Sequence, residues 1–125
     1  MARILIVDDD LLCRNIMTRA LVQRGHDIRA AADGPTAREM LREARFDALI
    51  CDMVLPGESG LQVVKDARGT HPDLKVIAVS GGKSDGKALP FDVLNTVQMF
   101  GTDAVVRKPF SVPSFVDSVE HALKQ

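Results

Sequence analysis

Short apolar runs recur along the chain, and each is followed by a stretch in which apolar residues return every three or four positions. The clearest run is Ile4-Leu5-Ile6-Val7. It is unbroken, as is typical of a strand buried on both faces of a parallel sheet. Further runs predict strands at 27–31, 47–52, 74–79 and 105–106. The amphipathic stretches predict helices over 11–24, from Pro35, from Leu61, over 90–100 and after Ser111.

Several local signals refine these elements. In the first helix, Leu12, Ile16, Ala20 and Leu21 give a roughly helical stripe that predicts the buried face, and Gly25 predicts the stop. Residues 56–60 read as a loop by composition. The glycine-rich segment 80–87 is expected to be either a mobile lid or partner contact, or a neutral insertion.

The order of elements predicts the fold class. Strand and helix alternate five times, which favours an α/β fold. We expect a five-stranded parallel sheet with helices on both faces, the doubly wound (βα)5 flavodoxin-like arrangement, joined by right-handed crossovers. No linker or internal repeat interrupts the alternation, so residues 1–125 are expected to form a single domain. Ligands of such sheets bind at the carboxyl ends of the strands.

Composition narrows the function. The chain has 125 residues, of which 46% are hydrophobic and 26% charged, a mixture typical of a globular domain. Sixteen basic and 17 acidic residues give a net charge of −1, so we expect no direct nucleic-acid binding. No apolar run approaches the roughly 20 residues of a membrane span, so we expect no membrane partner. The two cysteines form no metal-binding or disulfide pattern, which favours a reducing cytoplasm.

Polar residues stand at the carboxyl ends of four of the predicted strands. They are Asp8 and Asp9, Asp52, Ser80 and Lys108. Taken singly, each is explained by a turn or a solvated surface. Together at one sheet edge, three carboxylates need a cation, and an all-oxygen set favours Mg²⁺ over zinc. A hydroxyl and a lysine beside them suit a bound phosphoryl group.

The sequence resembles the receiver domains of two-component response regulators, of the chemotaxis-regulator type, in four motifs. The stretch ILIVDDD at 4–10 is similar to the first strand and acidic pair of that family. DMVLPGESG at 52–60 resembles the phosphoacceptor strand and its loop. VIAVS at 76–80 and VVRKPF at 105–110 resemble the strands that end in the switch hydroxyl and the Lys-Pro-Phe signature.

The resemblance implies a role for each matching position. Asp52 would accept a phosphoryl group from a sensor histidine kinase or a histidine phosphotransfer protein. Asp9 would bind Mg²⁺ directly, Asp8 would help through water, and the main-chain carbonyl of Val54 would complete the protein ligands. Such a protein is a phosphoacceptor that assists its own phosphorylation and dephosphorylation and not a conventional enzyme.

The resemblance also implies a conformational switch. Lys108 would pair with the phosphoryl oxygens, and its bond to Pro109 would be cis. Ser80 would move toward the phosphoryl group. A downstream protein target would then read the face formed by Pro90–Val106.

The sequence departs from the family pattern at three positions. Val105 stands where an aromatic residue often accompanies the switch, so either Val105 is simply core or another side chain, such as Phe91 or Phe100, reports the switch. Val54 and Gly82 stand where the family tunes hydrolysis, and neither can orient a water molecule. A long-lived phosphoryl-Asp52 is therefore expected.

Three alternatives remain at this stage. Asp8-x-Asp10 after an apolar strand resembles the start of haloacid-dehalogenase phosphatases, in which Asp8 would be the nucleophile and Asp10 the acid–base; otherwise Asp10 caps the first helix. A flavodoxin-like binding protein would share the topology, but the three aspartates would repel a phosphate. A pseudo-receiver would share the fold without being phosphorylated.

Overall fold

The protein is built on a parallel sheet of five strands. The computed structural model describes residues 1–81 and 101–125. All five strands run parallel, in the spatial order β2-β1-β3-β6-β7. Their bounds are β1 Arg3–Val7, β2 Asp27–Ala31, β3 Ala48–Asp52, β6 Lys75–Ser80 and β7 Ala104–Arg107. The five predicted strands and their parallel pairing are confirmed.

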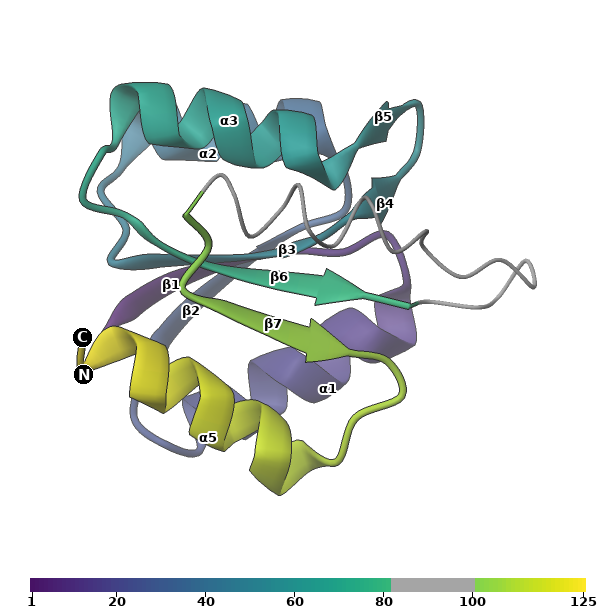
Figure 1. Ribbon diagram of the computed structural model, residues 1–125, viewed down its shortest axis with the longest axis vertical. Coiled ribbons are helices and arrows are strands. Elements are labelled where there is room, and N and C mark those ends of the chain that lie inside the picture. Colours follow the sequence, from purple (N-terminus) through teal and green to yellow (C-terminus); the bar gives the residue numbers. More distant parts are fainter. Residues whose placement is uncertain (82–100) are drawn as a thin grey trace.

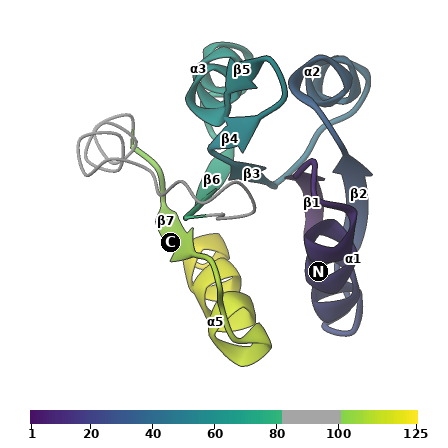
Figure 2. The ribbon, with the colours of Figure 1, turned by 90° about the vertical axis from the view of Figure 1, so that its right-hand side faces the viewer.

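Helices cover both faces of the sheet (Figure 1). Helices α2 and α3 lie on one face, and α1 and α5 lie on the other, as the end-on view in Figure 2 shows. Their bounds are α1 Leu11–Val22, α2 Gly34–Glu43, α3 Gly60–Thr70 and α5 Val112–Leu123. The helix expected over 90–100 lies outside the described residues, as do 82–87 of the glycine-rich segment and the candidate switch residues Phe91 and Phe100.

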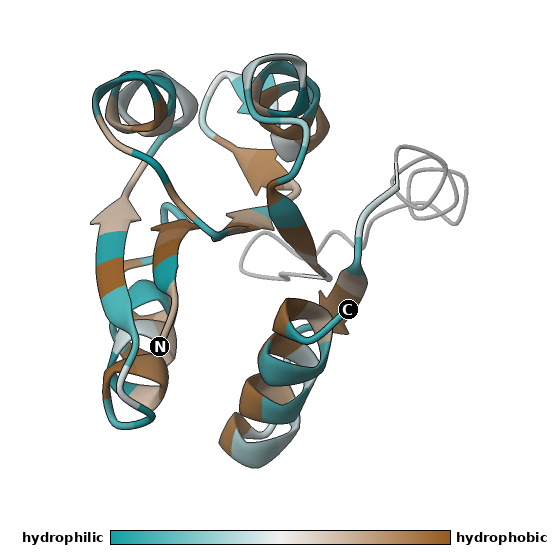
Figure 3. Ribbon diagram, turned by 90° about the vertical axis from the view of Figure 1, so that its left-hand side faces the viewer, coloured by the Kyte–Doolittle hydropathy of each residue, from teal (hydrophilic) through white to brown (hydrophobic). Residues whose placement is uncertain are grey.

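The alternation of side chains along each strand divides the core into two layers. Leu5 and Val7 pack beneath α2 and α3, whereas Ile4 and Ile6 pack against α1 and α5. All four side chains are fully buried. Each contributes about 1.5–3 kcal/mol of transfer free energy. In Figure 3 the ribbons of the central strands are mostly coloured as hydrophobic, whereas the ribbon of the edge strand β2 is coloured in part as hydrophilic. The unbroken apolar runs therefore mark strands covered on both faces.

Short polar side chains cap the amino ends of three helices. Asp10 caps α1 by accepting from the N–H groups of Leu12 and Cys13, and Asp33 and Ser111 cap α2 and α5 in the same way. The predicted caps at Asp10 and Ser111 are confirmed. Gly25, with φ of 90°, follows the end of α1, as expected of a residue that stops a helix.

Two local predictions are wrong. The buried residues of α1 are Met17, Ala20 and Leu21, whereas Leu12 and Ile16 are exposed by 70% and 39%. Ala20 and Leu21 are buried as predicted, so the error concerns Leu12, Ile16 and the missed Met17. The packing of α1 against the sheet and α5 decides which of two overlapping stripes is buried, and sequence periodicity alone does not. Residues 56–60 are also not a plain loop, because β4 Val54–Leu55 and β5 Glu58–Ser59 pair as a two-residue hairpin.

None of the helices in the described part of the chain is long and apolar enough to cross a membrane.

Candidate functional site

The sequence-predicted polar residues meet at the carboxyl edge of the sheet. Strands β1, β3, β6 and β7 all end at this edge, which faces the reader in Figure 2. The register sets Asp52 beside Val79, and Ser80 beside Arg107, so that Lys108 follows at the same level. The N–H of Lys108 donates to the Ser80 carbonyl at 2.7 Å and extends the ladder by one bond. Parallel pairing therefore brings together residues that are 100 positions apart in the chain.

Asp8, Asp9 and Asp52 form one carboxylate cluster. One carboxylate oxygen from each lies within 4.8 Å of the other two. Asp8 is fully buried and Asp52 is 5% exposed, whereas Asp9 is open to solvent. The N–H of Asp10 donates to Asp8 Oδ1 at 2.9 Å, and that of Val54 donates to Asp52 Oδ1 at 3.0 Å. Backbone donors thus fix one oxygen of each buried carboxylate and orient the other toward the shared space.

Lys108 places its ammonium between the two buried carboxylates. Its Nζ lies 2.9 Å from Asp8 Oδ2 and donates to Asp52 Oδ2 at 2.9 Å. The Lys108 side chain is 14% exposed. The Lys108–Pro109 bond is cis, as the resemblance implied.

For both Asp8 and Lys108, burial and the contacts between opposite charges shift the pKa in opposite directions. Burial raises the pKa of Asp8, and the contact with Lys108 offsets this in part. Burial lowers the pKa of Lys108, but hydrogen bonds and charge from Asp52 and Asp8 outweigh it and raise the pKa overall. Lys108 is therefore fully protonated at neutral pH and neutralises one of the three negative charges.

Ser80 supplies a buried hydroxyl at the end of β6. The residue is 1% exposed, and its Oγ has no hydrogen-bond partner within 1–81 and 101–125. Buried hydroxyls normally have a partner, so this one is available to an incoming group. Val105 is half-buried and packs against the layer of α2 and α3, which agrees with a core role.

Sequence reasoning missed two contacts of Asp8 with α1. Nη1 of Arg14 donates to the Asp8 carbonyl oxygen at 2.8 Å. Burial and the neighbouring Asp8 raise the pKa of the Cys13 thiol to about 11. Both residues come within one turn after the Asp10 cap, but no pattern in the sequence marks them. Cys51 is buried in the core, and its pKa is also raised by burial and by Asp52, so both thiols are poor nucleophiles.

The donor set fits a divalent cation. Three carboxylates and one ammonium leave two negative charges in a space lined by hard oxygen ligands. Such ligands favour Mg²⁺ or Ca²⁺ over zinc. Asp9 is the open side of the cluster, through which an ion and its waters can enter.

The raised pKa of Asp8 predicts that this residue destabilises the metal-free fold. A pKa above the ordinary value of 3.8 means that the folded state binds the proton more tightly, so stability falls as the pH rises from 3.8 through the folded-state pKa. Asp8→Asn keeps an oxygen for the Asp10 N–H and removes the charge. We expect it to stabilise the fold by about 0.5–2 kcal/mol at pH 7, measured by thermal unfolding in EDTA.

Asp10→Asn is the matched control for this prediction, because Asn caps helices as well as Asp and the charge change is the same. It should leave the stability close to that of the wild type. The gain from Asp8→Asn should shrink below pH 4, where the Asp8 carboxyl is neutral in both states. A wild type that is more stable than Asp8→Asn at pH 7 without metal would contradict the argument.

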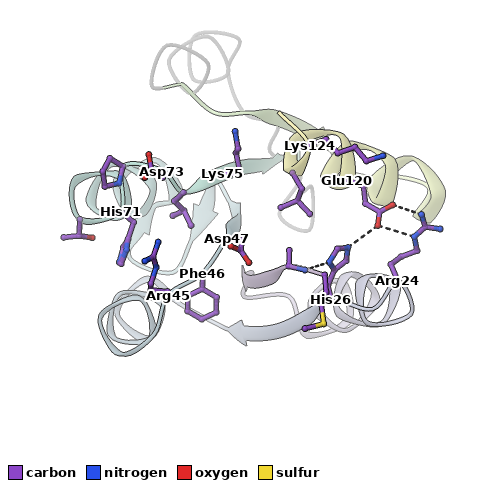
Figure 4. Close-up of a pocket in the computed structure, with 16 residues that line it drawn as sticks. Arg24, His26, Arg45, Phe46, Asp47, His71, Asp73, Lys75, Glu120 and Lys124 are labelled. Carbon is purple, nitrogen blue, oxygen red and sulfur yellow. Dashed lines mark hydrogen bonds and ion pairs between the residues drawn. The ribbon is translucent and has the colours of Figure 1, made fainter.

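A further cavity among the described residues lies at the opposite edge of the sheet. It has a volume of about 940 Å³ and is drawn in Figure 4. Arg24 and His26 point toward Glu120 of α5 there, with contacts of 2.6 and 3.1 Å. Helix carboxyl ends converge on this edge, and basic side chains beside them offset the helix dipoles. The cavity therefore needs no ligand to explain its charges.

Comparison with known proteins agrees with the fold and the edge site. The sequence model of the family described as response regulator receiver domain matches residues 4–120 of this chain. The chain therefore belongs to the response regulator receiver domain family, which acts in two-component signalling. The haloacid-dehalogenase alternative is not supported: Asp10, its required acid–base, caps α1 instead of joining the carboxylate cluster.

Individual relatives extend this assignment. The chain is 30% identical over 124 residues to the DNA-binding transcriptional regulator NtrC of Azospirillum brasilense, and 34% identical over 128 residues to the sensor kinase CckA of Brucella abortus. These matches cover 98% and 99% of the chain, but the chain spans 24% of NtrC and 13% of CckA. A CheY-like receiver domain protein from Methanospirillum hungatei has the same fold, with a TM-score of 0.89, 23% identity and coverage of 99% and 94% of the two chains.

Proposed function

We propose that this chain receives a phosphoryl group on Asp52 in a Mg²⁺-dependent reaction. The observation that carries the proposal is the Asp52 carboxylate, buried at the carboxyl edge, with its Oδ2 bonded to Lys108 and two further carboxylates beside it. Its Oδ1 is oriented by the Val54 N–H. A buried carboxylate that is already paired with a cation is prepared for an electrophile with negatively charged oxygens.

The chemistry is a displacement at phosphorus. A carboxylate oxygen of Asp52 forms the new P–O bond as the P–N bond of a phosphohistidine breaks, and the histidine imidazole leaves with the electron pair of that bond. The product is an acyl phosphate. Lys108 stays near the phosphoryl oxygens and offsets their charge, while the unpartnered Ser80 hydroxyl donates to one of them.

Asp8, Asp9, Asp52 and the main-chain carbonyl of Val54 would hold the Mg²⁺. When bound, the ion neutralises the charge of the carboxylates and the phosphoryl oxygens during transfer. Asp8 and Asp52 are held in place by backbone N–H donors before the ion binds, so little reorganisation is needed.

Membership in the receiver family supports a proposal for the phosphoryl donor and for the target. We propose a sensor histidine kinase or a histidine phosphotransfer protein as donor. Leu11 and Leu12 next to the cluster are exposed by 59% and 70%, a surface that suits a protein donor. The protein target would read a switch that starts at Ser80. The face assigned to it, Pro90–Val106, is described from residue 101 onward.

We propose that residues 1–125 act as one receiver domain, as a phosphoacceptor and not as a conventional enzyme. Cys13 and Cys51 are both free thiols, which agrees with a cytoplasmic location.

The direct test is to treat the protein with a small phosphodonor, such as phosphoramidate, with and without Mg²⁺. Borohydride reduction and peptide mass spectrometry then locate the acyl phosphate. Modification of Asp52 that requires Mg²⁺ supports the proposal. Modification of Asp8, or none at all, refutes it and favours a phosphatase or a pseudo-receiver, respectively.

The side chain at position 54 leads us to expect slow hydrolysis of phosphoryl-Asp52. Its side chain is 50% exposed at the rim of the site and is apolar, so it cannot orient an attacking water. Val54→Asn adds an amide that can do so. We expect the phosphoryl-Asp52 half-life to fall roughly 10-fold, less than the roughly 100-fold or more of a positioned acid or base, because an amide orients the water without taking its proton. Loss of inorganic phosphate measures it, with Val54→Thr as a variant of similar shape.

An unchanged or longer half-life in Val54→Asn would contradict the role of Val54. The backbone N–H that orients Asp52 is retained in both variants, so initial phosphorylation should remain.

A further inference from the structure

An ion-pair network joins α2, α3 and the hairpin that follows β3. Arg38 of α2 donates two hydrogen bonds to Glu58 of β5, at 3.0 and 2.7 Å, in a fork. Its Nε donates to Asp66 of α3 at 2.8 Å. The Arg38 and Glu58 side chains are 25% and 20% exposed. Such bidentate pairs fix orientation as well as distance.

The position of the Glu58 carboxylate is restricted further by Gly34. A Cβ at Gly34 would overlap this carboxylate, so the first residue of α2 leaves space that Glu58 fills. The amino end of α2 also favours a negative charge at this place. Arg38 is the charge partner that holds Glu58 there, and it lowers the pKa of Glu58.

Glu58 belongs to the hairpin that follows Asp52. In this hairpin Glu58 pairs with Leu55, and Val54 pairs with Ser59. At the base, the Gly60 N–H donates to the Met53 carbonyl at 2.8 Å, and a Cβ at Gly60 would overlap the Asp52 backbone. The base is thus packed against β3, while the Arg38 fork holds the other strand. Val54 lies between these two attachments.

We infer that Arg38 is a positioning residue for the divalent ion. By holding Glu58 it fixes the hairpin, and through the hairpin it fixes the Val54 carbonyl, as a metal ligand, and the Val54 N–H that orients Asp52. The inference rests on the proposed function, since it assigns a role in the same Mg²⁺ site. Arg38 itself pairs with Glu58 and Asp66 and reaches the ion through the backbone alone.

The sign of the effect separates positioning from simple electrostatics. Arg38→Met removes a positive charge, which by itself would strengthen Mg²⁺ binding. Loss of positioning weakens it. We expect the Kd for Mg²⁺ to rise roughly 10-fold in Arg38→Met, the low end of the effects of residues that orient metal ligands. The chain has neither Trp nor Tyr, so isothermal titration calorimetry is the suitable measurement.

Asp66→Asn is the matched control. It disturbs the third bond of the same guanidinium and leaves the fork to Glu58 intact. Because the Asp66 side chain is 44% exposed, we expect a change in Kd of less than about 2-fold. Electrostatics alone predicts the reverse order, with weaker Mg²⁺ binding in Asp66→Asn than in Arg38→Met.

Arg38→Lys serves if Arg38→Met does not fold, because it keeps the charge and loses the fork. Positioning predicts weaker Mg²⁺ binding in this variant, and electrostatics predicts no change. Melting temperatures of all variants show whether the fold is retained. If the wild type binds Mg²⁺ and is phosphorylated on Asp52 while both Arg38 variants match its Kd, this inference alone fails. A wild type that does neither overturns the proposed function and this inference together.

Discussion

Asp52→Asn is expected to abolish phosphorylation by a small phosphodonor. The amide nitrogen and oxygen cannot replace the carboxylate as nucleophile, so incorporation should fall at least about a thousandfold, as is usual when a nucleophile is removed. The fold should survive, because an Asn oxygen can still accept from the Val54 N–H. Intact-protein mass spectrometry at saturating phosphodonor and Mg²⁺ measures the incorporation.

The matched control for Asp52→Asn is Asp10→Asn. It makes the same Asp-to-Asn change at an aspartate that is near the cluster in sequence but is not part of it. Asp10 caps α1 and lies outside the carboxylate cluster, and Asn is an equally good cap. Its incorporation should equal that of the wild type. Full incorporation in Asp52→Asn would refute the assignment of the phosphoacceptor, and complete loss in Asp10→Asn would show that any charge change in this region blocks the reaction.

Lys108→Met should slow phosphorylation about 100-fold, which is the effect of removing one preorganised stabilising donor. The ammonium lies 2.9 Å from both buried carboxylates, where the phosphoryl oxygens of the product would be. Mg²⁺ binding should not weaken, because the positive charge that competes with the ion for Asp52 Oδ2 is removed. Single-turnover phosphorylation and calorimetry measure the two quantities separately.

Arg107→Met provides the matched control for Lys108→Met. Arg107 is the preceding residue, carries the same charge and is exposed to solvent. Its loss should change the rate little, since exposed charges are screened. If Lys108→Met lost Mg²⁺ binding and phosphorylation together, Lys108 would be needed to keep the carboxylates in place, and its proposed role toward the phosphoryl group would be wrong.

The sequence determined which residues could form the site. Four of the five strands are marked by apolar runs, and the site residues stand within two positions after the last apolar residue of such a run. Parallel pairing brings strand ends to one edge, so Asp8, Asp52, Ser80 and Lys108 could be placed together without coordinates. The caps at Asp10 and Ser111 were also predictable, because a side chain that accepts from the next turn acts over three residues.

The sequence did not determine which face of α1 is buried. Leu12 and Ile16 have the right spacing but stay exposed, and α5 and the sheet bury Met17 together with the predicted Ala20 and Leu21. Amphipathic periodicity predicts that one stripe of apolar residues faces the core. Which of two overlapping stripes is buried depends on how the neighbouring elements pack against the helix.

The tertiary structure alone decided how the carboxylates are held. The fork from Arg38 to Glu58 spans 20 residues, and the Lys108 contact with Asp52 spans 56. The sequence pattern can place strand ends at one edge of the sheet, but it carries no information on which side-chain atoms bond to each other across such separations. Burial of Asp8 and of the Ser80 hydroxyl, which has no hydrogen-bond partner in the part of the chain that the structure describes, also follows from packing. The chain thus specifies its strands and their polar ends by short-range rules, whereas charge, burial and orientation at the site arise when distant elements pack.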